Sequence, residues 1–272
     1  MDPRVSLLKE FYAGLPQDRA KVETYEHGFA YLEKLLSDGV RLEYGELTLT
    51  GLLHKYKLSH IPGFRMEEML QAHVEKRCNV CLYFDDTASN TFCFNLDNNH
   101  KTNNTALIPE MAFTVRFMRD QLMALGCVPL IIASGRGYHL WCRLEAAVPN
   151  DQLYDFMLRI SVTAMATLHE GDRDYRRIKI NLYPDRRIRG VVSLRLFGSD
   201  HAKNKLFSHV FTPDRLLDES ESWAVFEHHL RHGIIPLAKF REAHAAIRRQ
   251  SGEPAPESVN LSQGDEPAAG QS

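Results

Sequence analysis

The stretch from residue 91 to residue 183 most constrains the fold, because strand-like and helix-like patterns follow one another there in a fixed order. Strands show alternating or continuous apolar residues over about four to eight positions, whereas amphipathic helices repeat apolar residues every three or four positions. Pro109 and Glu110 suit the start of one helix, and Asn150 and Asp151 can cap another. The pattern predicts strands at 91–97, 127–133, 138–144 and 177–183, with helices at 109–125 and 150–168.

The order β-α-β-β-α-β is that of ferredoxin-like and RRM-like domains, so the sequence predicts an α+β core of this type. In the usual strand order of such domains, the first strand lies between the third and the fourth and runs antiparallel to both. The end of the first strand then meets the beginnings of its two neighbours. This places Asp97 beside His139 and Asn181.

Alternation along these strands sends two sets of side chains to opposite faces of the sheet. One set is apolar and is expected beneath the helices: Phe94, Leu96, Tyr138, Leu140, Ile178 and Ile180. The other set is expected on an open face: Asn95, Asp97, His139, Trp141, Arg143, Lys179, Asn181 and Tyr183. Because polar side chains from three strands converge there, we interpret the open face as a functional surface. Trp141 and Tyr183 are equally compatible with base stacking and with packing beneath N-terminal segments.

The rest of the chain divides by composition and pattern into further segments. Residues 1–76 are expected to be mostly helical, residues 77–215 to hold the core, and residues 216–250 to form a C-terminal helical segment. Within the core segment, residues 79–84 are expected to form a hairpin with the strand at 91–97. Residues 251–272 hold four acids and no Lys or Arg, and their Pro, Gly, Ser and Ala content predicts a disordered acidic tail.

The composition is that of a soluble globular chain, with 44% hydrophobic and 25% charged residues. No stretch of about 18 apolar residues occurs and the N-terminus has no apolar signal region, so we expect a cytoplasmic protein without a membrane partner. Five cysteines lack the regular spacing of a secreted disulfide scaffold and are expected to be thiols. Cys78 and Cys81, with Cys93 and His100, have part of a zinc-site spacing, but packing within strands is the preferred interpretation.

Positive charge is concentrated in residues 172–205. This segment holds ten Lys or Arg and four Asp, although the whole chain has a net charge of −2. Such a concentration suits the phosphates of a polyphosphate or a nucleic acid, and a solvated charged surface is the alternative. The first interpretation predicts that ligands with several phosphate groups bind near this segment.

Three motifs occur in order along the chain: Phe-Asn-Leu-Asp-Asn-Asn-His at 94–100, Ser-Gly-Arg-Gly-Tyr-His at 134–139, and Arg-Leu-Phe-Gly-Ser-Asp-His-Ala-Lys at 195–203. Together they resemble the catalytic motifs of the archaeo-eukaryotic primase superfamily. The closest likeness is to stand-alone primase-polymerases and to the primase domains of bacterial conflict or mobile elements. The resemblance extends from Cys78 to Pro213, roughly half of the chain, and its second motif is the most specific.

The resemblance implies a nucleotidyltransferase that adds nucleotides from nucleoside triphosphates to a primer on a DNA template, or starts such a primer, as in DNA replication. It implies two divalent ions, Mg²⁺ or Mn²⁺, with Asn95, Asp97 and either Asn181 or Asp185 as ligands. Asn95, Asp97, Asn181 and His139 would be the catalytic residues. The implied nucleotide-binding residues are Ser134, Arg136, Gly137, His139, Arg195, His201 and Lys203.

Two features of the sequence keep other functions open. Asn95 and Asn181 are neutral where the family has carboxylates, which weakens the attraction for a divalent cation. A catalytically degenerate member would keep the basic surface and bind nucleic acid or nucleotide. A third interpretation is a scaffold whose open face docks a partner such as a helicase, since the chain itself has no Gly-x4-Gly-Lys-Ser/Thr motif for unwinding.

Overall fold

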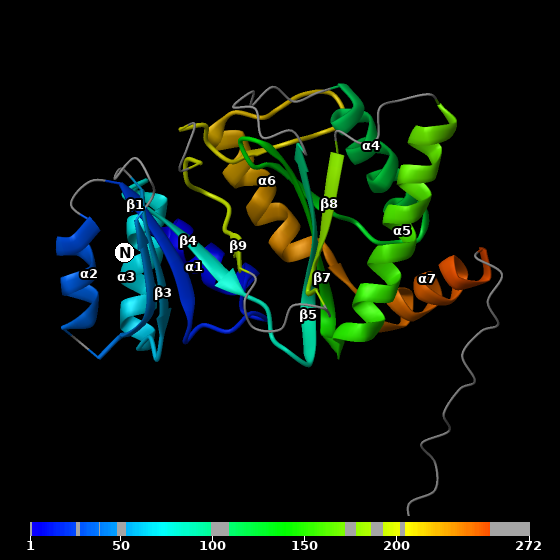
Figure 1. The fold of residues 1–272 in the computed structure, drawn as a ribbon. Helices are drawn as coiled ribbons and strands as arrows, with labels where there is room; N and C mark the ends of the chain where they lie inside the picture. The colour runs from blue at the N-terminus through cyan, green and yellow to red at the C-terminus, as the bar shows by residue number, and fades with distance from the viewer. Residues whose placement is uncertain are drawn as a thin grey trace, which may run out of the picture.

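The structure of the protein is a computed structural model that describes residues 2–25, 28–37, 39–47, 53–98, 109–171, 178–185, 193–201 and 205–250. Within these ranges the chain forms two sheets, whose strands are mostly antiparallel, with helices on their outer sides (Figure 1). We call them sheet A, built mainly from the N-terminal part, and sheet B, built mainly from residues 88–183. Sheet B contains the predicted core.

The predicted β-α-β-β-α-β order is confirmed in sheet B and its helices. The elements are β5 (Ala88–Asn98), α4 (Pro109–Ala124), β6 (Leu130–Ala133), β7 (Gly137–Pro149), α5 (Asn150–Glu170) and β8 (Ile178–Tyr183). The strands lie in the order β6-β7-β5-β8, so that β5 lies between β7 and β8 and is antiparallel to both, as predicted. Two short strands extend this sheet: β10 (His209–Val210) pairs with β6, and β11 (Ile234–Ile235) pairs with β7.

The face of sheet B beneath the helices is apolar because every second residue of its strands is apolar. Phe94 of β5 lies opposite Leu140 of β7 and Leu182 of β8, and all three are buried. The helices α4 and α5 cover this face with a buried stripe: Met111, Val115, Met118, Leu122, Leu153, Met157, Ile160, Ala164 and Leu168. These residues belong to the helical patterns in the sequence, which therefore located both helices correctly.

The expectation of a mostly helical region at residues 1–76 is wrong, because three strands lie between its helices. Its elements are α1 (Pro3–Phe11), β1 (Ala20–Tyr25), α2 (Gly28–Leu36), β2 (Arg41–Leu47), β3 (Leu53–Ser59) and α3 (Gly63–Val74). With β4 (Cys78–Tyr83) and β9 (Ser193–Arg195), these strands form sheet A in the order β2-β3-β1-β4-β9. The strand pattern is visible in β1, where buried Val22 lies between Lys21 and Glu23, because successive side chains point to opposite faces.

The expected hairpin between residues 79–84 and 91–97 is also wrong. β4 pairs with β1 and β9 in sheet A, whereas β5 pairs with β7 and β8 in sheet B. Residues 84–87 carry the chain from one sheet to the other. All six residues of β4 are buried, because other strands flank β4 on both edges and other parts of the chain cover both of its faces. An isolated hairpin would leave one face exposed.

The start of α5 differs from the expected cap. Pro149 occupies the N-cap position, and no side-chain hydrogen bond caps the helix there. Asn150 Nδ2 instead donates a hydrogen bond to the Asp85 carbonyl oxygen at 2.7 Å. This contact ties the start of α5 to the segment that connects the two sheets.

Figure 1 shows α2 and α3 on the outer side of sheet A and α4 and α5 on the outer side of sheet B. Aromatic side chains fill the region where α1, sheet B and α6 (Glu219–His232) come together. The ring of Tyr12, directly after α1, lies 5.1 Å from that of Trp141 in β7, and the rings of Phe11 and Phe226 lie 4.6 Å apart. Trp141 is fully buried. Its role is therefore packing beneath the N-terminal segment, and base stacking on Trp141 is excluded.

The C-terminal segment contains two helices, α6 and α7 (Leu237–Gln250), as predicted for residues 216–250. The expected tail at 251–272 and most of the basic residues in 172–205 lie outside the described residues. All five cysteines are free thiols in buried positions. In the ranges that the structure describes, no helix is long and apolar enough to cross a membrane.

Candidate functional site

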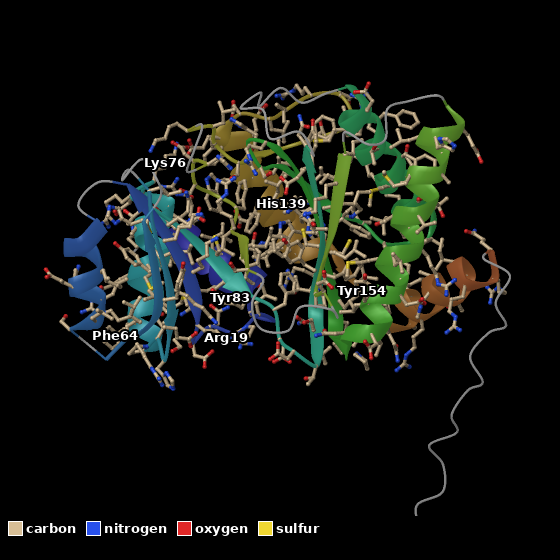
Figure 2. All side chains as sticks on the ribbon, viewed as in Figure 1. Arg19, Phe64, Lys76, Tyr83, His139 and Tyr154 are labelled. Atoms are coloured by element: carbon tan, nitrogen blue, oxygen red, sulfur yellow. The ribbon has the colours of Figure 1, made fainter. Side chains whose placement is uncertain are left out.

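The polar face of sheet B points away from α4 and α5 and toward sheet A. Asn95 of β5 lies opposite His139 of β7 and Asn181 of β8 in the register of the sheet. Directly opposite residues share one face of a sheet, so these three side chains are neighbours. Figure 2 shows His139 near the middle of the molecule, between the two sheets. The predicted convergence of polar residues from three strands on one face is therefore confirmed.

Asp97 lies two residues further along β5, opposite Gly137 and Lys179. The sequence prediction placed Asp97 directly beside His139 and Asn181, which is wrong by two residues of register, although the predicted face is correct. In the structure Asp97 pairs with Gly137, the first residue of β7, and His139 and Asn181 pair with Asn95 instead. Asp97 is consequently at the edge of the polar cluster.

Two glycines, Gly135 and Gly137, shape the turn between β6 and β7. The Ser134 N–H donates to the Gly137 carbonyl oxygen at 2.8 Å, and Gly135 adopts a φ of 91°, which favours glycine. A Cβ atom at position 137 would lie 1.8 Å from the Leu96 carbonyl oxygen of β5. Gly137 therefore allows the two strands to approach beside Asp97. Arg136 is exposed at the tip of the same turn.

Arg195 reaches sheet B from sheet A. It lies in β9 opposite Cys81 of β4, and its guanidinium donates hydrogen bonds to the carbonyl oxygens of Ser134 and Ser199. Arg195 is only 8% exposed, and burial lowers its pKa, although an arginine side chain stays charged in proteins. Among the described residues, no carboxylate lies within ion-pair distance of this guanidinium. A buried cation bonded only to carbonyl oxygens is suited to receive an anion.

His139 is buried beside Arg195. Burial lowers the pKa of His139 to about 3, and the charges of Arg195 and His201 act in the same direction. Its imidazole is therefore neutral at neutral pH and offers one N–H donor and one acceptor nitrogen. His201 is half-buried, so the third sequence motif reaches the site at this residue. Lys203, from the same motif, lies outside the described residues.

The facing side of sheet A adds an ion pair that the sequence analysis missed. Lys21 Nζ lies 2.8 Å from Glu23 Oε1 in β1. Burial opposes the charge of Lys21, but Cys81 and the Glu23 carboxylate together outweigh this and hold the pKa of Lys21 above its ordinary value. Burial raises the pKa of Tyr183 in β8 to about 12, and Lys21 is close enough to act against that shift. The alternation of polar and apolar residues in β1 was the available signal for this pair.

Asp185, one of the two candidates for the third metal ligand, is not brought to Asp97. Asp97 lies opposite Lys179 near the start of β8, whereas Asp185 follows the other end of this strand. The strand from Lys179 to Tyr183 alone spans about 13 Å. Of the two candidates, Asn181 is the one that the register places in the polar cluster.

We call Asn95, Asp97, His139, Lys179, Asn181 and Arg195 the inter-sheet site. Its donor set does not fit two divalent ions, because sites for two such ions are built from several carboxylates and this one has Asp97 alone. Asn95 Nδ2 donates to Asp97 Oδ2 at 3.2 Å, and Asn95 Oδ1 is buried without a hydrogen-bond partner, so one amide oxygen is left for a cation. Across the described ranges, no group of three or more His, Cys, Asp or Glu is placed to hold a metal ion.

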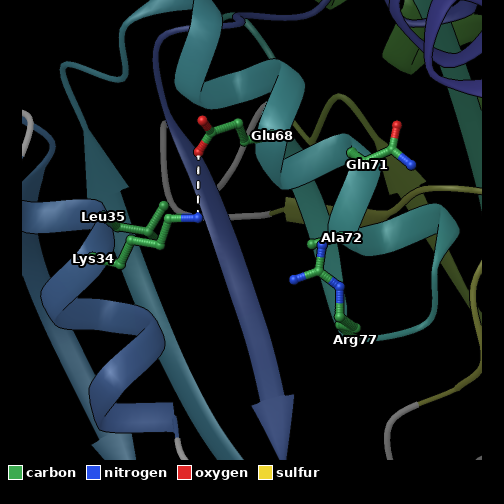
Figure 3. Close-up of a pocket in the computed structure, with 6 residues that line it drawn as sticks. All are labelled: Lys34, Leu35, Glu68, Gln71, Ala72 and Arg77. Atoms are coloured by element: carbon green, nitrogen blue, oxygen red, sulfur yellow. Dashed lines mark ion pairs between the residues drawn. The ribbon is translucent and has the colours of Figure 1, made fainter. Parts of the chain in front are cut away.

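A surface pocket of about 260 Å³ lies elsewhere, between α2 and α3 on the outer side of sheet A (Figure 3). Its lining residues are Lys34, Leu35, Glu68, Gln71, Ala72 and Arg77. Lys34 Nζ lies 4.0 Å from Glu68 Oε2, and Arg77 pairs with Glu75 at 2.6 Å. Because its charged groups neutralise one another, this pocket is less suited to phosphate than the inter-sheet site.

Comparison with solved structures yields likenesses in fold. No known protein family and no curated protein matches the sequence. The fold is similar to that of the polymerase domain of Mycobacterium tuberculosis ligase D, solved in complex with DNA, with a TM-score of 0.48 and 14% sequence identity. The similarity covers 85% of this chain and 90% of that chain. The polymerase activity and the bound DNA are properties of that protein.

Proposed function

We propose that the chain binds the phosphates of a nucleoside triphosphate or a nucleic acid at the inter-sheet site, as a nucleotidyltransferase-like protein with a primase-like core. The observation that supports this most is the buried guanidinium of Arg195, whose hydrogen bonds within the described residues go to the carbonyl oxygens of Ser134 and Ser199. The carboxylates of Glu23 and Asp200 act on this charge only from beyond ion-pair distance, so an anion that completes its hydrogen bonds is favoured. Arginine is well suited to phosphate because its planar group binds two oxygens at once.

His139 supplies a second group for the same phosphates. Its neutral imidazole can donate one hydrogen bond, and a bound anion would raise its pKa by stabilising the protonated form. The exposed Arg136 and the half-buried His201 lie at the margins of this region and are proposed to contact phosphates further from Arg195. Lys203 is proposed to do the same from the third motif.

Replacing Arg195 by glutamine should weaken the binding of ATP by about 10-fold to about 100-fold. The reason is that a hydrogen bond from a charged group contributes roughly 1.5 to 3 kcal/mol, which the neutral amide does not supply. Calorimetric titration of the full chain with ATP measures the change. His139→Asn should weaken binding less, because a neutral donor is lost there.

The matched control is Lys239→Ala, which removes an exposed cation of α7 that pairs with Glu242 at 2.9 Å. This variant should bind ATP as the wild type does. Thermal melts followed by circular dichroism establish that each variant is folded. A folded Arg195→Gln protein with wild-type affinity for ATP would show that the phosphate site is elsewhere.

Nucleotidyl transfer to a primer on a DNA template is the second candidate function. The observation in its favour is that Asn95 and Asp97 share one face of β5, with Asn181 directly opposite Asn95. These are the positions at which the primase resemblance places metal ligands. Under this function DNA and nucleoside triphosphates are the proposed ligands, and a helicase is the proposed partner.

The double substitution Asn95→Asp with Asn181→Asp should strengthen Mn²⁺ binding, because it adds two carboxylates beside Asp97. Calorimetric titration with Mn²⁺ measures the binding, and extension of a labelled primer on a DNA template, with deoxy- or ribonucleotides, measures transfer. If the wild type extends the primer, Asp97→Ala should stop it. A double variant that binds Mn²⁺ no more tightly than the wild type would contradict the assignment of these positions.

A further inference from the structure

We infer that the inter-sheet site binds its phosphate ligand as a free anion, without a divalent cation, and that Lys179 supplies positive charge where the primase resemblance would place a metal ion. This inference rests on the proposed function, since it concerns the same site and the same phosphates. Beyond the proposed function, it states that the phosphate binds without a metal ion, and it names Lys179 as a binding residue outside the sequence motifs.

The position of Lys179 follows from the register of sheet B. Lys179 of β8 lies directly opposite Asp97 of β5, and the two side chains share the polar face. Directly opposite residues in an antiparallel pair have Cβ atoms about 5 Å apart, so the lysine ammonium can reach any group bound beside Asp97. Lys179 is exposed, and no ion pair holds its ammonium among the described residues. The ammonium is therefore available to a ligand.

The charges of the inter-sheet site favour an anion over a divalent cation. Asn95 and Asn181 are neutral, and Asp97 is the single carboxylate among the six residues. Lys179 and Arg195 are both cations, so positive groups outnumber negative ones among these six residues, while the carboxylates of Glu23 and Asp200 act on Arg195 from outside the site. A divalent cation entering this site would be repelled by both cations, whereas a phosphate would be attracted by them.

The hydrogen bond of Asp97 supports the same conclusion. Its Oδ2 accepts from Asn95 Nδ2 at 3.2 Å, so the amide turns a donor toward the carboxylate. The hydrogen bond that Asp97 receives in this site therefore comes from an amide donor, which satisfies a carboxylate oxygen without a metal ion. Two carboxylates in the places of Asn95 and Asn181 would instead repel Asp97 unless a cation lay between them.

The test is a calorimetric titration of the full chain with ATP, once in buffer with EDTA and once with Mg²⁺. ATP should bind in EDTA at least as tightly as with Mg²⁺, because Mg²⁺ neutralises part of the phosphate charge that Lys179 and Arg195 attract. Lys179→Ala should weaken binding in EDTA by about tenfold, the loss of one exposed charge-assisted contact. The control Lys239→Ala should leave affinity unchanged in both buffers.

A second variant, Lys179→Asp, places a carboxylate opposite Asp97 and should make ATP binding depend on Mg²⁺. Wild-type binding that disappears in EDTA and returns with Mg²⁺ would overturn the metal-free inference and leave the proposed function intact. Binding in neither buffer would overturn both. Lys179→Ala and Lys179→Asp proteins that bind ATP like the wild type in EDTA would remove Lys179 from the site.

Discussion

Gly137→Ala should destabilise the protein by about 3 kcal/mol or more and abolish ATP binding. The added Cβ atom would lie 1.8 Å from the Leu96 carbonyl oxygen and 3.3 Å from the Cα atom of Asp97. Both contacts are with backbone atoms, so no side-chain rotation can relieve them. β5 and β7 must then separate at the inter-sheet site. Urea unfolding of the wild type and the variant measures the loss of stability.

The control is Gly45→Ala, which also adds a methyl group to a glycine within a strand. In β2 this Cβ atom would lie 3.7 Å from Cδ1 of Tyr56, an ordinary contact distance. Stability should therefore change by less than about 1 kcal/mol. Equal stabilities of the two variants would show that β5 and β7 do not approach each other as closely as the structure has them.

The core around sheet B could be predicted from the sequence because its signals are local and long. The helices α4 and α5 have apolar residues at helical spacing over four or more turns, and β5 alternates between Phe94, Asn95, Leu96 and Asp97. For a given strand order, the alternation of side chains along each strand determines which of them share a face. A register error of two residues keeps every side chain on its face, so the predicted polar face was correct although the partners of Asp97 were not.

Sheet A could not be predicted in this way because its pairings are not local. The arms of the expected hairpin, β4 and β5, are adjacent in sequence, and adjacent strands usually pair with each other. Here β4 pairs with β1, some 60 residues earlier, and with β9, more than 110 residues later. In residues 28–36, the helical stripe of Phe29, Leu32 and Leu36 gave a stronger signal than the short strands on either side.

The candidate site was found only in part for the same reason. Asn95, His139 and Asn181 lie on neighbouring strands of one predicted sheet, so their proximity followed from the pattern. Arg195 was expected near phosphate from its motif, but its burial against Ser134 depends on the pairing of β9 with β4. No pattern within a single segment specifies a contact between two sheets.

Lowering the pH from about 7 to about 4 should reduce the free energy of unfolding by about 3 kcal/mol through His73 alone. In the fully buried imidazole of His73, Nδ1 accepts from the Val80 N–H at 3.1 Å and Nε2 donates to the Phe197 carbonyl oxygen at 2.9 Å. Burial lowers its pKa from 6.5 to about 4. Above about pH 6.5 His73 is neutral in both the folded and the unfolded state, so its protonation does not reduce the free energy of unfolding. Below that value His73 binds a proton in the unfolded chain, whereas in the folded protein it stays neutral down to about pH 4. The free energy of unfolding therefore falls between about pH 6.5 and about pH 4.

Urea unfolding at several pH values across this window measures the slope, to which His139 adds in the same direction because burial lowers its pKa to about 3. His73→Gln should reduce the slope even if it lowers stability at neutral pH, since the variant has no group at this position that binds a proton. The control His228→Gln changes an exposed histidine of α6 and should keep the wild-type slope. If His73→Gln and the wild type lose stability in parallel as the pH falls, the imidazole of His73 is not held neutral by the core. The contact of α3 with β4 and Phe197 would then differ from the one described.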